Sequence, residues 1–214
     1  MCKEKTYLSV KEYEPVLIVS VLILFLILTV AVVSAFWPKY EERFFELGLL
    51  GKDKKAEGYF TNNNTILETG SSVFWHIYIH NHMGSTQKVS IKVKLLNSTM
   101  QAPNDQEHES SPILCFIEFP VTLSVNETKL IPFSWSILEA DFHGSFIIVK
   151  RLIVNNQTIE VDPPTLSDDN RFRVVFELWV YDESIEQYRF EWDSGKGFYS
   201  VSLYIWFRLA TPIM

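Results

Sequence analysis

An uncharged apolar run from Val16 to Trp37 is the feature that most limits what this chain can fold into. As an α-helix at about 1.5 Å per residue, the run would be about 33 Å long, enough to cross a hydrocarbon core of about 30 Å. Pro15 precedes it and Pro38 follows it, and proline favours helix boundaries. Its backbone polar groups would all be satisfied internally, as lipid requires. The sequence therefore predicts one transmembrane helix, with Trp37 and Tyr40 at a membrane interface.

A cleavable signal peptide is the alternative, because Val33-Ser34-Ala35 resembles a small-residue cleavage site. Two features favour a membrane anchor instead. The run is longer than the apolar region of about 7–15 residues that is typical of signal peptides. The segment before it also carries no net charge. We therefore predict a cytoplasmic N-terminus over residues 1–15 and a charged juxtamembrane connector over residues 38–57.

Sequons decide the predicted orientation, because lysine and arginine flank both ends of the run. Each of the four Asn-x-Ser/Thr sequons lies beyond the run, in an expected loop or strand end; their acceptors are Asn63, Asn97, Asn126 and Asn156. This pattern predicts a single-pass glycoprotein of the cell membrane with an extracellular C-terminal domain. Cys2 and Cys115 would then lie on opposite sides of the bilayer, which excludes a disulfide between them. Within its apolar run, Cys115 is expected to be a small buried thiol.

Beyond residue 58, apolar and polar residues alternate with the period of half-buried β-strands. The clearest strands are expected at residues 87–95, 129–137, 171–181 and 199–207, and further strands at 72–79, 113–119, 145–154 and 188–192. Turn residues separate them, together with two longer loops over residues 97–111 and 162–170. About eight or nine antiparallel strands at this spacing predict an all-β, immunoglobulin-like antiparallel β-sandwich over residues 58–210.

Several short motifs resemble those of a known family. They are Phe44-Phe45-Glu46-Leu47-Gly48-Leu49-Leu50-Gly51, Lys55-Ala56-Glu57-Gly58-Tyr59, Thr61-Asn62-Asn63, Gly70, Asn81-His82, Phe176–Tyr181 and Val201–Trp206. In these motifs the chain resembles the archaeal membrane proteins catalogued as domain of unknown function 1616, although Met83 and Phe60 replace an acidic residue and a proline of that pattern. The resemblance covers roughly residues 41–208. It implies an archaeal cell envelope and an extracytoplasmic β-domain, and it brings no known activity or catalytic residues.

Charge and motifs argue against several classes of function. The formal net charge is −7 and lysine and arginine are not clustered, which disfavours nucleic-acid binding. The sequence contains no Gly-x-Ser-x-Gly elbow, phosphate-binding glycine-rich loop, His-Glu-x-x-His or Cys-x-x-Cys motif. We therefore expect a protein that is not an enzyme and has no cofactor.

Three histidines form the one candidate metal site. On a strand that includes residues 72–79, His76, His80 and His82 share the face opposite the core. Residues two apart on such a face lie about 6.5–7 Å apart, so His80 and His82 could bind one Cu or Zn ion with a third ligand from elsewhere. The alternative is that they are ordinary polar residues of a solvent-facing strand.

Four aromatic residues are expected to point away from the core: Trp179, Tyr181, Tyr204 and Trp206. They could face a protein partner, in the membrane or a surface layer, or stack on carbohydrate. The leading hypothesis is therefore a non-catalytic, membrane-anchored envelope protein whose sandwich has a binding, structural or accessory-subunit role. A metal- or small-ligand-binding module built on the three histidines is the alternative, and an enzyme acting on envelope glycans is a third.

Overall fold

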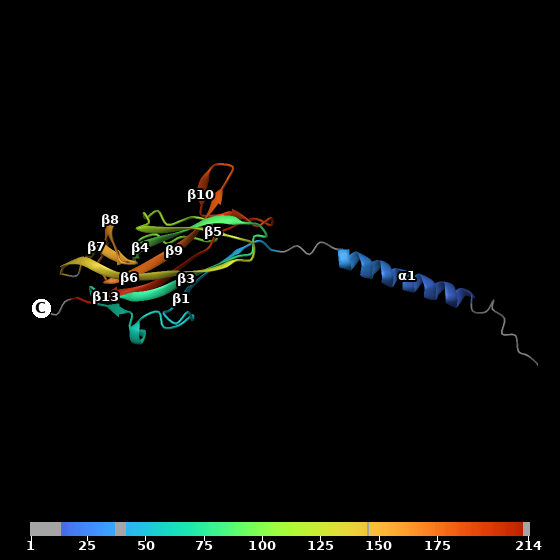
Figure 1. The fold of residues 1–214 in the computed structure, drawn as a ribbon, viewed down its shortest axis with the longest axis horizontal. Coiled ribbons are helices and arrows are strands. Elements are labelled where there is room, and N and C mark those ends of the chain that lie inside the picture. Colours follow the sequence, from blue (N-terminus) through green and yellow to red (C-terminus); the bar gives the residue numbers. More distant parts are fainter. Residues whose placement is uncertain (1–13, 37–41, 145, 212–214) are drawn as a thin grey trace, which may run out of the picture. The chain divides into compact units, whose positions relative to one another are not determined.

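The computed structural model describes residues 14–36, 42–144 and 146–211, which form an N-terminal helix and a separate β-sheet body (Figure 1). Cys2, Trp37 and Tyr40 lie outside the described residues, so the interface positions expected for the two aromatic residues stay predictions.

Helix α1 spans Glu14–Phe36 and carries no charged residue from Pro15 onward. The hydroxyl groups of Ser20, Thr29 and Ser34 each donate to a backbone carbonyl of the preceding turn, so they are already hydrogen-bonded within the helix. None of the apolar window is buried against other described residues. The helix therefore has the length and composition of either a membrane anchor or a signal sequence.

The body consists of two main sheets and a small third sheet. Sheet A has the order β1 (Phe45–Leu50), β3 (Val73–Asn81), β6 (Thr128–His143), β7 (Phe146–Val154) and β8 (Gln157–Ser167). Sheet B has the order β2 (Ile66–Leu67), β13 (Ser202–Leu209), β9 (Arg171–Asp182), β4 (Gln87–Asn97) and β5 (Ile117–Leu123), with β10 (Gln187–Arg189) paired to β9. The third sheet pairs β11 (Trp192–Asp193) with β12 (Phe198–Tyr199), and η2 covers Thr61–Asn63.

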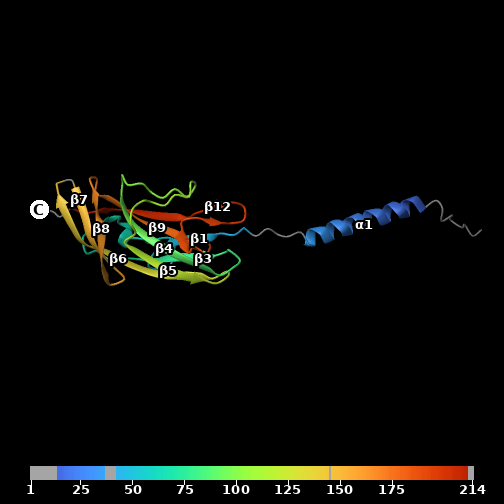
Figure 2. The ribbon, with the colours of Figure 1, turned by 90° about the horizontal axis from the view of Figure 1, so that it is seen from above.

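The strand order confirms the predicted immunoglobulin-like antiparallel sandwich. The adjacent strands β1, β3 and β6 correspond to strands A, B and E of that architecture, and β4, β9 and β13 correspond to C, F and G. All pairings are antiparallel except the short parallel contact of β2 with β13. The β7–β8 hairpin extends sheet A, and Figures 1 and 2 both show these two strands side by side at one end of the body.

The core lies between the two sheets, as the alternating pattern predicts. In β4, Val89, Ile91, Val93 and Leu95 are all buried, and in β9 the alternate residues from Phe172 to Val180 are buried as well. Trp75 of β3 is fully buried at the centre, where its ring contacts four aromatic rings from other segments: Phe60, Phe133, Trp135 and Phe176. Its indole nitrogen donates to the carbonyl of Tyr59 at 2.6 Å.

Several predicted boundaries are wrong, including those of the connector, of one loop and of one strand. The connector expected over residues 38–57 contains β1, so the sandwich begins before residue 58. The loop expected over residues 162–170 instead continues β8 to Ser167, because an edge strand tolerates Pro163 and Pro164. The strand expected at residues 113–119 begins only at Ile117, although the Phe116 N–H already donates to the Val93 carbonyl of β4.

Candidate functional site

The outer face of sheet B carries a group of two arginines and two exposed aromatic residues. We call Arg171, Arg173, Tyr204 and Trp206 the arginine–aromatic patch. Adjacent strands β9 and β13 present it, with Trp206 directly opposite Arg173 in the register. Tyr204 is 52% exposed and Trp206 is 37% exposed.

The guanidinium groups of the patch lie close to its aromatic rings. The guanidinium of Arg173 lies 4.9 Å from the ring centre of Trp206 and 5.5 Å from that of Tyr204. Arg171 lies 5.8 Å from the Trp206 ring. Cations at these distances from an aromatic face are attracted by the quadrupole of the ring. The patch is therefore an ordered arrangement and not a set of independent surface side chains.

The two arginines differ in how their charge is balanced. Arg171 donates to Asp169 at 2.9 Å. Partial burial raises the pKa of Asp169, but hydrogen bonds from the Arg171 side chain and backbone and from Ser167 outweigh it and lower the pKa to about 2. Arg173 is only 8% exposed, donates to the carbonyl of Met100 at 2.6 Å and leaves its Nε without a partner.

No carboxylate forms a salt bridge with Arg173 among the described residues of the sandwich. Burial lowers the pKa of Arg173, and the neighbouring Tyr204 phenol acts in the opposite direction. The guanidinium nevertheless stays protonated, because arginine is not deprotonated in proteins. Arg173 is therefore a mostly buried positive charge that the body itself does not neutralise.

A buried ion pair fixes the loop beside the patch. Lys94 of β4 and Glu177 of β9 meet at 2.8 Å, with 4% and 0% of their side chains exposed. Glu177 also accepts hydrogen bonds from the Ser111 backbone and the Trp179 indole, and Lys94 donates to the Ser111 carbonyl. Together with the bond from Arg173 to the Met100 carbonyl, these bonds to Ser111 hold the loop against the outer face of sheet B. Figure 2 shows this loop, in light green, next to the red strand β13.

Trp179 and Tyr181, the other two predicted surface aromatics, do not belong to the patch. Lys92 covers the face of Trp179 at 3.7 Å, and the indole nitrogen is bound to Glu177. Tyr181 packs edge-on against Tyr188 of β10 at 5.2 Å. Both rings are half-buried within the body, so the predicted four-residue surface reduces to Tyr204 and Trp206.

The three candidate histidines are not brought together. His76 is buried, and its Nδ1 lies 3.2 Å from the Gly51 carbonyl. His80 and His82 have ring centres 4.0 Å apart, and Nε2 of His82 lies 3.0 Å from Glu46. Over the described ranges, no group of three His, Cys, Asp or Glu side chains is placed to share a metal ion. The predicted three-histidine site is therefore reduced to a pair.

Glu46 explains how the histidine pair is held. Hydrogen bonds from the Tyr78 hydroxyl and then from His82 lower the pKa of the Glu46 carboxyl. His80 in turn lies 2.6 Å from the Thr128 hydroxyl, and Phe44 stacks on His82 at 4.2 Å. These contacts join β1 to β3 and β6, which is a structural use of the polar face.

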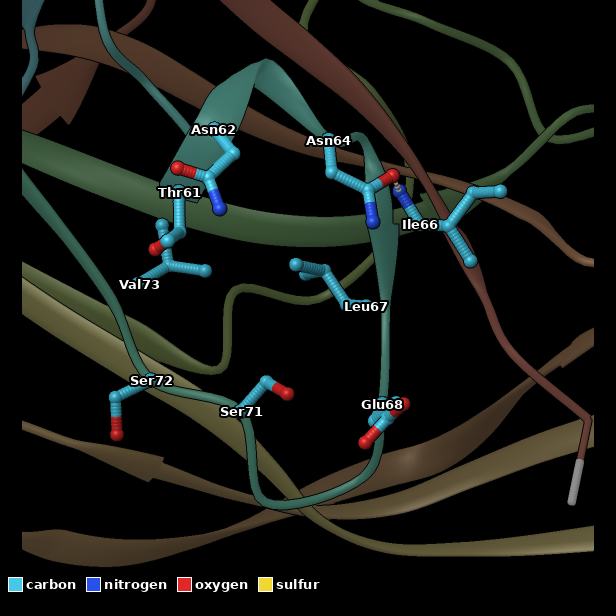
Figure 3. Close-up of a pocket in the computed structure, with 9 residues that line it drawn as sticks. All are labelled: Thr61, Asn62, Asn64, Ile66, Leu67, Glu68, Ser71, Ser72 and Val73. Carbon is cyan, nitrogen blue, oxygen red and sulfur yellow. Dashed lines mark hydrogen bonds between the residues drawn. The ribbon is translucent and has the colours of Figure 1, made fainter.

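A polar pocket of about 430 Å³ lies beside η2 and β2 (Figure 3). Hydroxyl, amide and carboxylate groups line it, including those of Thr61, Asn64, Glu68 and Ser71. Figure 3 shows the Asn64 side chain accepting a hydrogen bond from the Ile66 backbone. The sequence did not indicate this pocket, because its residues are the ordinary composition of a loop.

The predicted glycan acceptors fall into two classes. Asn63, Asn126 and Asn156 are exposed in turns with positive φ. Asn97 is buried: its Nδ2 donates to the Leu166 carbonyl at 2.6 Å, and its Oδ1 accepts from two backbone N–H groups of the following turn. In the folded body Asn97 is therefore not an accessible acceptor, and glycosylation at the other three stays a prediction.

Comparisons with known proteins give limited similarity. No family model matches the sequence, so the resemblance to domain of unknown function 1616 stays a prediction, and no curated protein matches. Among solved structures, a CARDB domain from Pyrococcus furiosus in complex with di-metal ions has a TM-score of 0.38 at 8% identity, covering 80% of this chain and 91% of that chain. A mutant β-glucosidase from Listeria innocua in complex with laminaribiose has a TM-score of 0.36 at 12% identity, and only 17% of that chain is covered. At these TM-scores neither similarity supports an inference about ligands or activity.

Sequence reasoning missed the two arginines of the patch. Arg171 and Arg173 share the outward face of β9 with Trp179. The period-two pattern that placed Trp179 on this face would therefore have placed the two arginines there as well. The contact between Arg173 and Trp206 depends on the pairing of β9 with β13, which a single sequence does not specify.

Proposed function

We propose that this chain is a membrane-anchored, non-catalytic binding module that holds a protein partner through the arginine–aromatic patch. The observation that carries the proposal is Arg173, a buried cation without a carboxylate partner, next to the exposed rings of Tyr204 and Trp206. The partner would be a component of the membrane or of the cell surface.

Helix α1 supports the anchoring part of the proposal. A long helix without charges, whose own hydroxyls are hydrogen-bonded internally, is stable in lipid. Exposed sequons at Asn63, Asn126 and Asn156 support an extracellular body, since glycans are found on surface loops of exported domains. Together they support a single-pass protein with its C-terminal body outside the cell.

The composition of the patch supports a protein partner. Tryptophan, tyrosine and arginine are the residue types that dominate binding energy at protein interfaces. Carbohydrate recognition is less well supported, because flat sugar faces stack on open ring faces. The rings of Tyr204 and Trp206 stand at 83° to each other and so do not form a common platform.

Replacing Trp206 with alanine tests the proposal. We expect its partner to be lost from the protein purified out of native membranes in mild detergent, because truncating an interface hot spot costs about 2 kcal/mol or more, roughly thirtyfold in affinity. Phe74→Ala is the matched control: Phe74 is 38% exposed, against 37% for Trp206, but lies on sheet A. The proposal is wrong if both variants retain the same partners in equal amounts.

A further inference from the structure

Strand β13 has an open backbone edge along most of its length. On one side it pairs with β9 from Ser202 to Arg208. On the other side it pairs with β2 only at Arg208 and Leu209. The segment between these ends lies at the side of sheet B and carries both aromatic residues of the patch.

The backbone N–H groups of the even-numbered residues of β13 face the open edge. Arg208 and Ala210 donate their N–H groups to Thr65 and Leu67 on the β2 side. Ser202 donates its N–H to the carboxylate of Asp105 at 3.0 Å. Because direction alternates along a strand, the N–H and C=O groups of the intervening even-numbered residues, Tyr204 and Trp206, point to the same side. No described group bonds to them there.

The inner face of β13 is also incompletely covered at this edge. Leu203 and Ile205 point toward the core but stay partly exposed, whereas Phe207, opposite β2, is buried. Two other sheet edges carry proline, Pro120 in β5 and Pro163 in β8, which blocks the addition of a strand. The described part of β13 has neither proline nor an inward-pointing charge to protect its edge.

We propose that an extended acidic segment of a protein partner adds to the β13 edge as a further strand. This inference rests on the proposed function and specifies its binding mode. Backbone groups of the segment would pair with Tyr204 and Trp206, as in other cases of strand addition. Its acidic side chains, on the outer face, would meet the uncompensated Arg173, and its apolar side chains, on the inner face, would cover Leu203 and Ile205.

The length of the open edge and the positive charge beside it determine the length and the sequence of the segment. The window between Ser202 and Arg208 accommodates roughly five residues at about 3.3 Å each. A suitable sequence alternates glutamate with a β-branched residue, because successive side chains of a strand point to opposite faces. The open edge of β1, the equivalent edge strand of sheet A, fits this segment less well, because Glu46 would repel it and no arginine of the patch lies there.

A fluorescent peptide with alternating glutamate and valine, titrated against the full chain in detergent micelles, tests the inference. The informative pair of variants is Tyr204→Ala and Tyr204→Pro. Both remove the ring, but only proline also removes the N–H that faces the open edge, and no bond to β9 is lost. We expect Tyr204→Pro to bind the peptide about three- to tenfold more weakly than Tyr204→Ala, the effect of one backbone hydrogen bond.

Two further peptides complete the experiment. The first is N-methylated at the alternate residues whose N–H groups would pair with β13, and it should not bind. The second has lysine in place of glutamate, and it should not bind either. Equal affinity of the two Tyr204 variants, with both folded by circular dichroism, would overturn strand addition, as would failure of the wild-type chain to bind the acidic peptide. Neither result would test the proposed function itself. Partner binding through the arginine–aromatic patch is measured separately, by co-purification with the Trp206→Ala variant.

Discussion

Replacing Glu177 with alanine should lower the free energy of unfolding by about 3–5 kcal/mol, the cost of leaving one partner of a buried ion pair without the other. Glu177 is fully buried and accepts bonds from Lys94, the Ser111 backbone and the Trp179 indole, so all three donors would lose their acceptor. For a body of this size the midpoint of thermal unfolding should fall by roughly 6–20 °C. Urea unfolding of the full chain in micelles, followed by tryptophan fluorescence, measures the change.

The double variant Lys94→Met, Glu177→Leu is the matched control. It removes both charges together, and replacing a whole buried ion pair with apolar side chains is often neutral or stabilising. We therefore expect it to be clearly more stable than Glu177→Ala. A loss below about 1 kcal/mol for the single variant would contradict the conclusion that this pair anchors residues 98–116 to sheet B.

Replacing Trp75 with alanine should destabilise the body to a similar extent, by about 3–5 kcal/mol. Trp75 is fully buried and packs against Phe133, Trp135 and Phe176, so its loss leaves a cavity between the two sheets. It also removes the hydrogen bond from the indole nitrogen to the Tyr59 carbonyl. The same urea titration gives the magnitude.

The neighbouring residue supplies the control for this substitution. Phe74 lies on the opposite face of β3 and is 38% exposed, so Phe74→Ala should change stability by much less, about 1 kcal/mol or below. If the Trp75 and Phe74 variants were equally stable, the assignment of the two faces of β3 would be wrong. The comparison therefore tests the alternation on which the sandwich was predicted.

Strands with a polar face and an apolar face were predictable, because burial of one face imposes a period of two. The pattern located β4 and β9 closely, and all the predicted core residues of β4 are buried. It failed at edges: β8 accommodates two prolines that normally indicate a loop, and β1 lies in a segment whose surrounding charges resemble a connector. Edge strands bury less surface, so their sequences are less constrained.

The candidate site was only partly predictable for a related reason. Outward-pointing aromatic residues are visible in the sequence, but which of them remain free depends on what packs over them. Lys92 and Phe190 cover Trp179, and Phe190 comes from a segment beyond the end of β9. The contact of Arg173 with Trp206 likewise requires the register of two strands separated by the β10–β12 region. Such long-range pairings are set by tertiary packing and not by local pattern.

The central claim is that the apolar helix anchors the sandwich outside the cell. Labelling of the two cysteines with a membrane-impermeant maleimide tests this claim most directly. In intact cells that express the full chain, Cys115 should be labelled and Cys2 should react only after permeabilisation. Cys2→Ser and Cys115→Ser variants assign each signal, and the solubilised protein shows whether the partly exposed Cys115 thiol reacts. Labelling of Cys2 but not Cys115 before permeabilisation would contradict the account, and so would release of a soluble protein lacking residues 1–35.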